Sequence, residues 1–402
     1  MNILFLTIGA LPDIDMSDIY ADLLRCFRDQ GHNVYVVFPY QKRLNLTTKC
    51  FFQSEIKMLG VQIGNITKCG MIEKGISTLM IESQYKKAIQ KHFADVKFDL
   101  VMYSTPPITL AGVVDYIKKR DGARSYLLLK DIFPQNAVDL GMMITTGPKS
   151  IIYKMFRRKE QKLYALSDHI GCMSPANVDF VLKHNPEIPS EKVEVCPNCI
   201  EPRDMSVTAE ERSSMRKKYG IPEDKVVFVY GGNLGKPQGI PFLIDCIRSQ
   251  KDNAEAFFLI VGSGTEYGKL ETFAKEEPQK NFKLMSALPK EDYDKMAASC
   301  DVGMIFLDHR FTIPNFPSRL LVYMQAKLSV LACTDPNTDV GRIAEDGGFG
   351  WWCESNSVEA FGEKVILVCK ADRKVMGEAA DQYLKEHYTV QDGYRTIIEH
   401  FT

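Results

Sequence analysis

The segment spanning residues 227–240 is the part of the chain best suited to bind an anionic ligand. It reads Val-Phe-Val-Tyr-Gly-Gly-Asn-Leu-Gly-Lys-Pro-Gln-Gly-Ile, so an apolar strand runs into a turn with four glycines and then into a helix near Pro241. Glycines let a backbone approach a ligand closely, and the N–H groups at the start of a helix favour an anion. Lys236 adds a positive charge. These features predict a phosphate-binding loop; a tight turn without a ligand is the alternative.

Two further turns of the same half carry residues of this kind. Gly262-Ser-Gly-Thr-Glu266 follows the next apolar run, and Pro317-Ser-Arg319 precedes a helical pattern. The first is a weak dinucleotide signal because the third glycine of that fingerprint is missing, so we interpret it as another wall of the phosphate site. Ser318 is predicted to cap its helix, and Arg319 can bind a phosphate through two hydrogen bonds. The alternative for the second turn is a capped helix with an exposed arginine.

The elements that must position these turns alternate regularly. Apolar strand patterns and helical patterns follow one another along the chain, and the rhythm restarts after an interruption near residues 197–205. Strands that are apolar throughout are typical of parallel sheets covered by helices on both faces. The sequence therefore predicts an α/β protein with two Rossmann-like doubly wound domains facing a cleft. We place the first at 1–200 and the second at 201–385, followed by a C-terminal helix over 386–402 that crosses back to the first domain.

Composition narrows the classes of function. The 402 residues carry 50 Lys and Arg against 51 Asp and Glu, so the net charge of −1 gives no reason to expect a nucleic-acid partner. No apolar run is long enough for a membrane span, and the start of the chain lacks the basic residues of a secretory signal. The eleven cysteines are not densely spaced, as in proteins of reducing compartments. We expect a cytoplasmic protein.

The segment Lys149–Leu166 mixes apolar and basic residues at helical spacing. A basic amphipathic helix of this kind docks on anionic membrane surfaces. The segment therefore predicts peripheral contact with the inner face of the cell membrane. A helix packed on its own domain with a solvated basic edge is the alternative.

Together these motifs resemble the retaining GT-B glycosyltransferases of glycosyltransferase family 4, and among them enzymes of O-antigen and capsule assembly such as the L-fucosamine transferase group. The segment Tyr230–Gly239 is similar to the family's Tyr-x-Gly-Asn-x-Gly-x-x-Gln-Gly loop, and Pro317–Leu320 to its Pro-Ser-Lys-Leu turn. In the first half, Lys130–Pro134 is similar to its Asp-Leu-Trp-Pro segment and Gly31–Val34 to its Gly-His-x-Val strand. The resemblance extends over essentially the whole chain.

The resemblance implies transfer of a sugar, with retention of configuration, from a nucleotide-diphosphate sugar to a lipid-linked glycan acceptor in bacterial surface polysaccharide biosynthesis. It implies no cofactor and no metal, since Lys236 and Arg319 would stabilise the leaving diphosphate. Asp131 would lie near the acceptor, or else cap the helix that follows it. The implied donor-binding residues are Gly9, Gly232, Asn233, Lys236, Gln238, Gly262, Gly264, Glu266, Pro317, Ser318 and Arg319.

Two family positions depart from the pattern. The family has two glutamates eight positions apart around the donor, and the alignment of motifs puts Pro314 and Val322 in their places. Glu266, Asp308 or backbone groups would have to replace the missing carboxylate. The departure keeps a different class of function open, a GT-B scaffold without catalysis that partners an active transferase. A nucleotide-sugar epimerase is a further alternative, although the acidic groups and histidine that it needs are not apparent.

Overall fold

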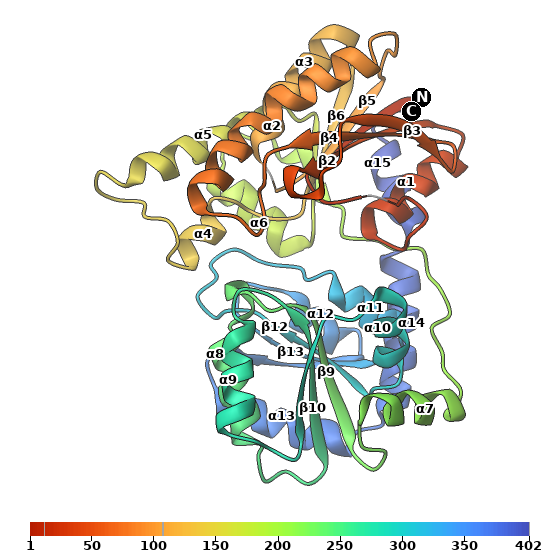
Figure 1. Cartoon of the computed structure of the whole chain (residues 1–402), viewed down its shortest axis with the longest axis vertical. Helices are drawn as coiled ribbons and strands as arrows, with labels where there is room; N and C mark the ends of the chain where they lie inside the picture. The colour runs from red at the N-terminus through yellow and green to blue at the C-terminus, as the bar shows by residue number, and fades with distance from the viewer. Residues whose placement is uncertain (12, 107, 402) are drawn as a thin grey trace. The chain divides into compact units, whose positions relative to one another are not determined.

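The computed structural model describes residues 1–11, 13–106 and 108–401, and in it the chain folds as two compact units (Figure 1). The first unit comprises residues 1–201 together with 390–402, and the second comprises residues 202–389. Each unit is an α/β structure built around a mainly parallel sheet. The predicted fold class, with two parallel-sheet domains, is confirmed.

The first unit contains an eight-stranded sheet in the order β3-β4-β2-β1-β5-β6-β7-β8. All described neighbours pair in parallel except β3 and β4, which form an antiparallel pair at the edge. Every residue of β5 is buried, as expected for a strand covered on both faces. The strands are β1 (Asn2–Leu6), β2 (Asn33–Gln41), β3 (Lys49–Gln53), β4 (Ile56–Ile63), β5 (Leu100–Ser104), β6 (Arg124–Leu129), β7 (His169–Cys172) and β8 (Val193–Val195).

Helices on both sides of this sheet complete the first unit. The carboxylate of Asp18 accepts a hydrogen bond from the N–H of Tyr20 and caps α1, whose apolar residues enter the core of the sheet. A helix from the end of the chain, α15, packs against α1. The helices are α1 (Ile19–Asp29), α2 (Met71–His92), α3 (Ala111–Asp121), α4 (Gln135–Asp139), α5 (Ser150–Leu166), α6 (Pro175–His184) and α15 (Val390–Ile398), with short 3₁₀ turns η1 (Lys42–Leu44), η2 (Ile108–Leu110) and η3 (Ser190–Lys192).

The second unit contains a six-stranded sheet in the order β11-β10-β9-β12-β13-β14, parallel throughout. Its strands are β9 (Val226–Asn233), β10 (Ala256–Ser263), β11 (Phe282–Ser286), β12 (Val302–Phe306), β13 (Ser329–Thr334) and β14 (Gly350–Glu354). Its helices are α7 (Ala209–Tyr219), η4 (Lys236–Gln238), α8 (Ile240–Ser249), α9 (Tyr267–Glu276), α10 (Lys290–Ala298), α11 (Arg319–Gln325), α12 (Val340–Asp346), α13 (Val358–Lys370) and α14 (Arg373–His387). The turns singled out in the sequence follow β9 and β10 and precede α11.

The sequence pattern differs from the structure in two places. The strands β3, β4 and β14, at or next to a sheet edge, do not stand out in the apolar alternation. The C-terminal helix expected over residues 386–402 begins only at Val390, because α14 extends to His387 and α15 spans Val390–Ile398. Buried Tyr388 follows α14, and the N–H of Val390 donates to the carbonyl of Ile200. The apolar residues Val390, Ile397 and Ile398 of α15 belong to the hydrophobic core of the first unit.

Candidate functional site

The end of β9 and the end of β10 approach each other at two glycines. Gly232 pairs in register with Gly262, and a Cβ atom on Gly262 would lie 2.0 Å from the carbonyl oxygen of Gly232. Gly232 itself has a φ of +115°, a conformation that side chains disfavour, and open space surrounds the position of its missing Cβ. Glycine is therefore required at both positions, and the backbone beside Gly232 remains accessible.

The turn after β9 is fixed by a buried glutamine. The Oε1 atom of Gln238 accepts hydrogen bonds from the N–H of Gly235 at 3.1 Å and from Nδ2 of Asn233 at 3.0 Å. Gly239 has a φ of +57° and leads directly into α8. Asn233 and Gln238, both predicted as donor contacts, thus bind each other and shape the loop.

Lys236 begins the turn η4 with its side chain exposed. Within residues 1–11, 13–106 and 108–401, no carboxylate lies close enough to form an ion pair with its ammonium group. A cation without a partner, adjacent to exposed glycine backbone, attracts an anion. This position agrees with the anion-binding loop expected from the sequence.

The turn after β10 is held against the first loop. A Cβ atom on Gly264 would lie 2.3 Å from the carbonyl oxygen of Leu234. The N–H of Leu234 donates to the carbonyl of Ser263, and the N–H of Glu266 donates to the carbonyl of Leu234, both at 2.9 Å. The two loops therefore form one continuous glycine-lined surface, which we call the glycine cradle (residues 231–239 and 262–266).

Arg319 lies beside the cradle but its guanidinium group is engaged with an aromatic ring. The guanidinium carbon lies 4.3 Å from the centre of the Tyr230 ring, a cation–π contact. The Tyr230 hydroxyl donates to the carbonyl of Asn233 at 2.8 Å, which links Arg319 to the loop. The Nη1 atom of Arg319 is buried and has no hydrogen-bond partner in the part of the chain that the structure describes. A buried cationic nitrogen without an acceptor is costly, so an anion next to it would be favoured.

Ser318 does not cap its helix, contrary to the sequence prediction. It occupies the N-cap position of α11, but its φ of −60° and ψ of −19° are helical and its side chain makes no capping hydrogen bond. The carbonyl of the preceding Pro317 accepts instead from the N–H of Leu320 at 3.1 Å. The exposed hydroxyl of Ser318 is consequently available for other contacts.

Neither position assigned to a family glutamate carries a polar side chain. Pro314 is buried, and Val322 lies partly buried on α11. Of the two carboxylates expected to substitute, that of Asp308 accepts hydrogen bonds from Arg310 Nε at 2.9 Å and Nη2 at 2.7 Å. Burial alone would raise the pKa of Asp308, but these bonds outweigh it and lower the pKa. Among the described residues, the carboxylate of Glu266 forms an ion pair only with exposed Lys269, one helical turn away, so it has fewer partners than that of Asp308.

Asp131 belongs to the first unit, directly after β6. Its Oδ2 atom accepts a hydrogen bond from Nδ2 of Asn136 at 2.7 Å. Burial raises its pKa to about 6, although hydrogen bonds from Ile132 and Asn136 oppose the shift, and the neighbouring Glu160 adds to it. The alternative role as a helix cap is wrong, because α4 begins at Gln135 and has Pro134 at its N-cap.

Gly9 also belongs to the first unit, in the exposed turn after β1. Its N–H donates to Oγ1 of Thr7 at 2.9 Å. The structure thus brings together, within the second unit, the predicted residues of the cradle and those at the start of α11. Asp131 and Gly9 lie in the other unit and have local environments of their own.

Two tyrosines beside Gly231, Tyr293 and Tyr323, escaped the sequence analysis. The hydroxyl of buried Tyr323 accepts from the N–H of Gly231 at 3.1 Å, and the Tyr293 hydroxyl occupies the space where a Cβ of Gly231 would lie. Tyr323 follows Arg319 by four residues, a spacing that places both on one face of a helix and so gave a usable signal. Tyr293 had none, since it comes from the distant helix α10.

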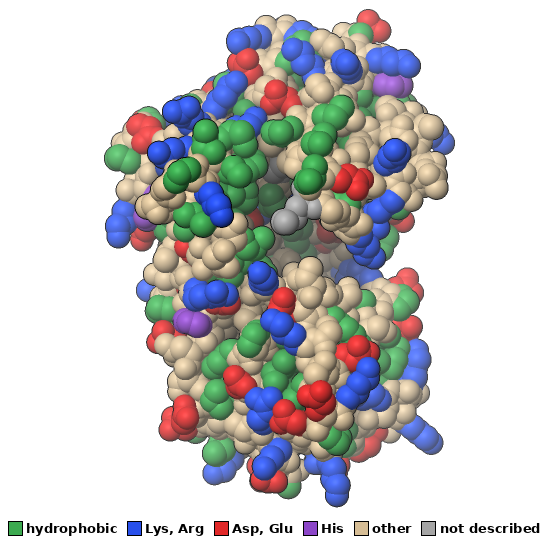
Figure 2. Space-filling model, turned by 60° about the vertical axis from the view of Figure 1, so that its left-hand side comes forward, with side chains coloured by type: hydrophobic (Ala, Val, Ile, Leu, Met, Phe, Trp, Pro, Cys, Tyr) green, Lys and Arg blue, Asp and Glu red, His purple; other side chains and the backbone are tan. Residues whose placement is uncertain are grey.

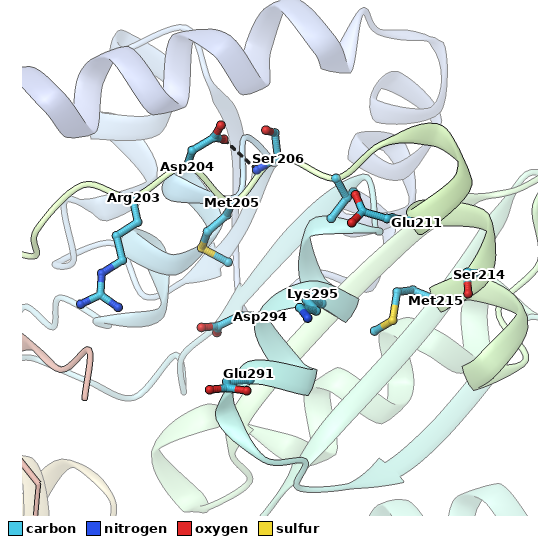
Figure 3. A pocket seen from close by; sticks show the side chains of 11 residues that line it. Arg203, Asp204, Met205, Ser206, Glu211, Ser214, Met215, Glu291, Asp294 and Lys295 are labelled. Atoms are coloured by element: carbon cyan, nitrogen blue, oxygen red, sulfur yellow. Dashed lines mark hydrogen bonds between the residues drawn. The ribbon is translucent and has the colours of Figure 1, made fainter. Parts of the chain in front are cut away.

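A separate pocket of about 620 Å³ lies elsewhere in the second unit (Figure 3). It is bordered by the segment 203–207, α7 and α10, and the N–H of Ser206 donates to the carboxylate of Asp204 at 2.9 Å on its rim. None of its described lining residues belongs to the glycine cradle.

Among the described residues, no group of three or more potential ligands is arranged to hold a metal ion. No helix in the same part of the chain is long and apolar enough to cross a bilayer.

Comparisons with known proteins agree with this geometry. Residues 211–383, most of the second unit, match the family Glycosyl transferases group 1. The probable glycosyltransferase WbjE of Pseudomonas aeruginosa is 25% identical over 293 residues, which cover 72% of this chain and 71% of that protein. The putative colanic acid biosynthesis glycosyl transferase WcaI of Escherichia coli K12 is 23% identical over 295 residues, with the same coverage.

Solved structures show the same fold. HepE of Anabaena, in complex with UDP-glucose, aligns with a TM-score of 0.70 at 14% identity, covering 100% of this chain and 99% of that one. The architecture is therefore the GT-B fold of glycosyltransferases. Within that class, the chain is similar to glycosyltransferases of bacterial polysaccharide biosynthesis.

Proposed function

We propose that this protein is a retaining glycosyltransferase that transfers a sugar from a nucleotide-diphosphate sugar to a lipid-linked glycan in bacterial surface polysaccharide biosynthesis. The observation that carries the proposal is the glycine cradle, where Gly262 lets β10 approach Gly232, whose backbone is exposed on the same turn as the unpaired Lys236. A family match over residues 211–383 supports the same interpretation, because it covers the cradle. HepE, a structural relative, binds UDP and UDP-glucose, so uridine donors are the first to test.

The diphosphate is the part of the donor that the cradle would hold. Lys236 and Arg319 would stabilise the charge that develops on the leaving diphosphate, in a reaction that needs no metal. Ser318, Pro317 and Glu266 would contact the remainder of the donor. Glu266 takes the place of the family glutamate absent at Val322, because its carboxylate is less occupied than that of Asp308.

The first unit would bind the acceptor, with Asp131 near the reacting hydroxyl and Gly9 in the turn after β1. A pKa of about 6 leaves Asp131 largely ionised at pH 7 and able to accept a hydrogen bond from that hydroxyl. Membership of glycosyltransferase family 4 and the link to capsule or O-antigen assembly are parts of this proposal, as is an acceptor carried on a lipid.

A lipid-linked acceptor requires access to a membrane, and the first unit has a suitable face. On α5, Ile151 and Ile152 are exposed, with Lys154 and Arg158 beside them. Four apolar residues on α2 are exposed at helical spacing, namely Ile72, Ile76, Leu79 and Met80. Both helices pack on η2, and Figure 2 shows hydrophobic side chains gathered on this unit with lysines and arginines around them. We propose that this face contacts the cytoplasmic side of the membrane.

Thermal unfolding with a panel of nucleotide sugars tests the donor. The panel contains UDP, UDP-glucose, UDP-N-acetylglucosamine and nucleotide-activated L-fucosamine, each at millimolar concentration with and without EDTA. We expect at least one to raise the melting temperature by several degrees, and EDTA to leave that shift unchanged. If none changes it, the donor assignment fails.

A second candidate function is a non-catalytic GT-B scaffold that stabilises an active transferase, and Val322 is the observation that favours it. Measuring turnover of the nucleotide sugar distinguishes the transferase from the scaffold. A transferase converts a binding donor in the presence of membranes that carry the acceptor, and Glu266→Gln slows it. A scaffold binds without turnover and copurifies with a second transferase.

A further inference from the structure

A pocket of about 240 Å³ lies in the first unit beside Asp131. Its walls are the loop over residues 132–135, helix α5 and helix α6. On α5 the lining residues are Tyr153, Arg157, Glu160 and Tyr164, whose spacing puts them on one face of the helix. Ligand pockets for drug-sized molecules span about 300–1,000 Å³, so this one suits a single ring rather than a nucleotide sugar.

The charged groups of the pocket already neutralise each other. Arg157 Nη1 lies 2.7 Å from Glu160 Oε2, and Tyr164 donates to the other oxygen of Glu160 at 2.8 Å. Arg157 Nη2 donates to the carbonyl of His184 at 3.0 Å and to the side chain of Asn185. No cation in this network remains free for a phosphate, and a single paired carboxylate does not suit a metal ion. The ligand that fits is therefore uncharged.

The polar groups near the pocket that lack a hydrogen-bond partner are suited to bind a polyhydroxylated ring. The hydroxyl of half-buried Tyr153 makes no hydrogen bond within residues 1–11, 13–106 and 108–401. Next to Gln135 of the pocket wall, Asn136 on α4 donates through Nδ2 to Asp131, and its buried Oδ1 has no partner among the described residues. The Phe180 ring, stacked on His184 at 3.9 Å, adds an apolar surface. Sugar rings combine hydroxyl groups at the edge with apolar C–H faces, and thus match both features.

We propose that this pocket binds one neutral sugar residue of the acceptor glycan, between Tyr153 and Phe180 and next to Asp131. The inference rests on the proposed function, since it names the part of the acceptor that the first unit recognises. Tyr153 is a positioning residue, because it holds the glycan and not the reacting atoms.

Two faces of helix α5 would then contribute to acceptor binding, one through the pocket and the other through the membrane. The face over Tyr153, Arg157, Glu160 and Tyr164 lines the pocket, whereas Ile151, Ile152 and Met155 are exposed. Ile151 is 71% exposed, only two residues from Tyr153. A lipid tail in the membrane and a sugar in the pocket would therefore be held by one helix. Substitutions at Tyr153 and at Ile151 therefore form a matched pair, because one alters the face of α5 that lines the pocket and the other alters the exposed apolar face.

Ligand-observed NMR titration of the full-length protein tests the proposal. The probes are the methyl glycosides of glucose, galactose, mannose, N-acetylglucosamine and fucose, with saturating UDP present to occupy the donor site. We expect one or more to bind with a millimolar dissociation constant. Tyr153→Phe, which removes one neutral hydrogen bond, should weaken that binding about fivefold. Ile151→Ser should leave it unchanged and instead reduce sedimentation with vesicles of anionic phospholipid.

The outcomes separate this proposal from the donor assignment. Absence of binding by every glycoside up to about 100 mM, or equal binding by wild type and Tyr153→Phe, would overturn the pocket assignment even if UDP binds. Competitive displacement by inorganic phosphate would also overturn it, since that result defines an anion site. Glycoside binding that depends on Tyr153, without any UDP binding, would retain the pocket and reject the donor. Melting temperatures of both variants control for folding.

Discussion

The glycine cradle and the Asp131 region both follow parallel strands, but backbone atoms form the first and side chains form the second. The cradle is shaped by backbone, because the missing side chains of Gly262 and Gly264 let two loops touch. The Asp131 region is shaped by side chains, with a half-buried residue, Asp131, whose pKa is raised to about 6, and a buried acid, Glu160, beside it. The stability of the cradle should therefore be sensitive to added side-chain volume, and that of the Asp131 region to the ionisation of Asp131.

The largest effect is expected from adding one methyl group to the cradle. Gly262→Ala would place a Cβ 2.0 Å from the carbonyl oxygen of Gly232, so β9 and β10 must separate. We expect the free energy of unfolding to fall by about 3 kcal/mol. Trp351 and Trp352, the two tryptophans of the chain, both lie in the second unit, so urea unfolding followed by their fluorescence measures it.

Gly268→Ala in α9 is the matched control. Nothing lies within 4 Å of the added Cβ at that position, and alanine favours helix by about 0.5–1 kcal/mol. Equal destabilisation by the two substitutions would mean that the close approach of the strands is not what makes glycine necessary at position 262.

A smaller effect, dependent on pH, is expected in the Asp131 region. Folding favours the protonated form of Asp131, because its pKa rises from 3.8 to about 6. The stability gained is fully present below pH 3.8 and is lost as the pH rises through about 6. Asp131→Asn, which cannot ionise, should therefore be more stable than wild type above pH 6, by about 2 kcal/mol, and equal to it near pH 4.

Hydrogen exchange of the amides in β5 and β6 measures this difference in the first unit. The amide introduced by Asp131→Asn retains an oxygen that can accept from Asn136, so the loop is kept. A difference in protection that stays constant from pH 4 to pH 7 would contradict a raised pKa at this position. The same substitution should slow transfer, whereas it should leave UDP binding in the second unit unchanged.

The contrast also explains what could be predicted from the sequence. Local patterns revealed every strand except β3, β4 and β14, and also the glycines at 232, 239, 262 and 264, because strand burial and backbone freedom depend on neighbouring residues. They did not reveal that Gln238 binds Asn233, that Arg319 stacks on Tyr230, or that Tyr293 fills the space beside Gly231. These contacts join side chains from separate elements. For the same reason the pocket beside Asp131, with walls from three segments, had no signal.

The third prediction concerns charge at the cradle. Lys236→Gln should weaken binding of a nucleotide-diphosphate donor about fivefold, roughly 1 kcal/mol, because the ammonium group is exposed and screened by water. The difference from wild type should shrink between about 50 mM and 500 mM salt. Lys280→Gln, at another exposed lysine of the second unit, is the control. Calorimetric titration with UDP measures both, and an unchanged affinity for Lys236→Gln would remove this residue from the site.

The smallest expected effects come from substitutions at the N-termini of two helices in the second unit, α7 and α11. Thr208 caps α7 fully, since its Oγ1 accepts from the N–H of Glu211 at 3.2 Å and the Glu211 carboxylate accepts from the N–H of Thr208 at 2.8 Å. Thr208→Ala should therefore cost about 1 kcal/mol of stability and leave UDP affinity unchanged. Ser318 makes no capping bond, so Ser318→Ala should change stability by less than about 0.5 kcal/mol.

If the Ser318 hydroxyl instead donates to a phosphate oxygen, its loss should weaken UDP binding about threefold, as expected for one hydrogen bond in water. The two variants would then show opposite responses in the same pair of measurements, tryptophan fluorescence and calorimetry. A loss of stability for Ser318→Ala with unchanged UDP affinity would identify it as a structural cap after all. In that case the phosphate would be held by the glycine cradle alone, without α11.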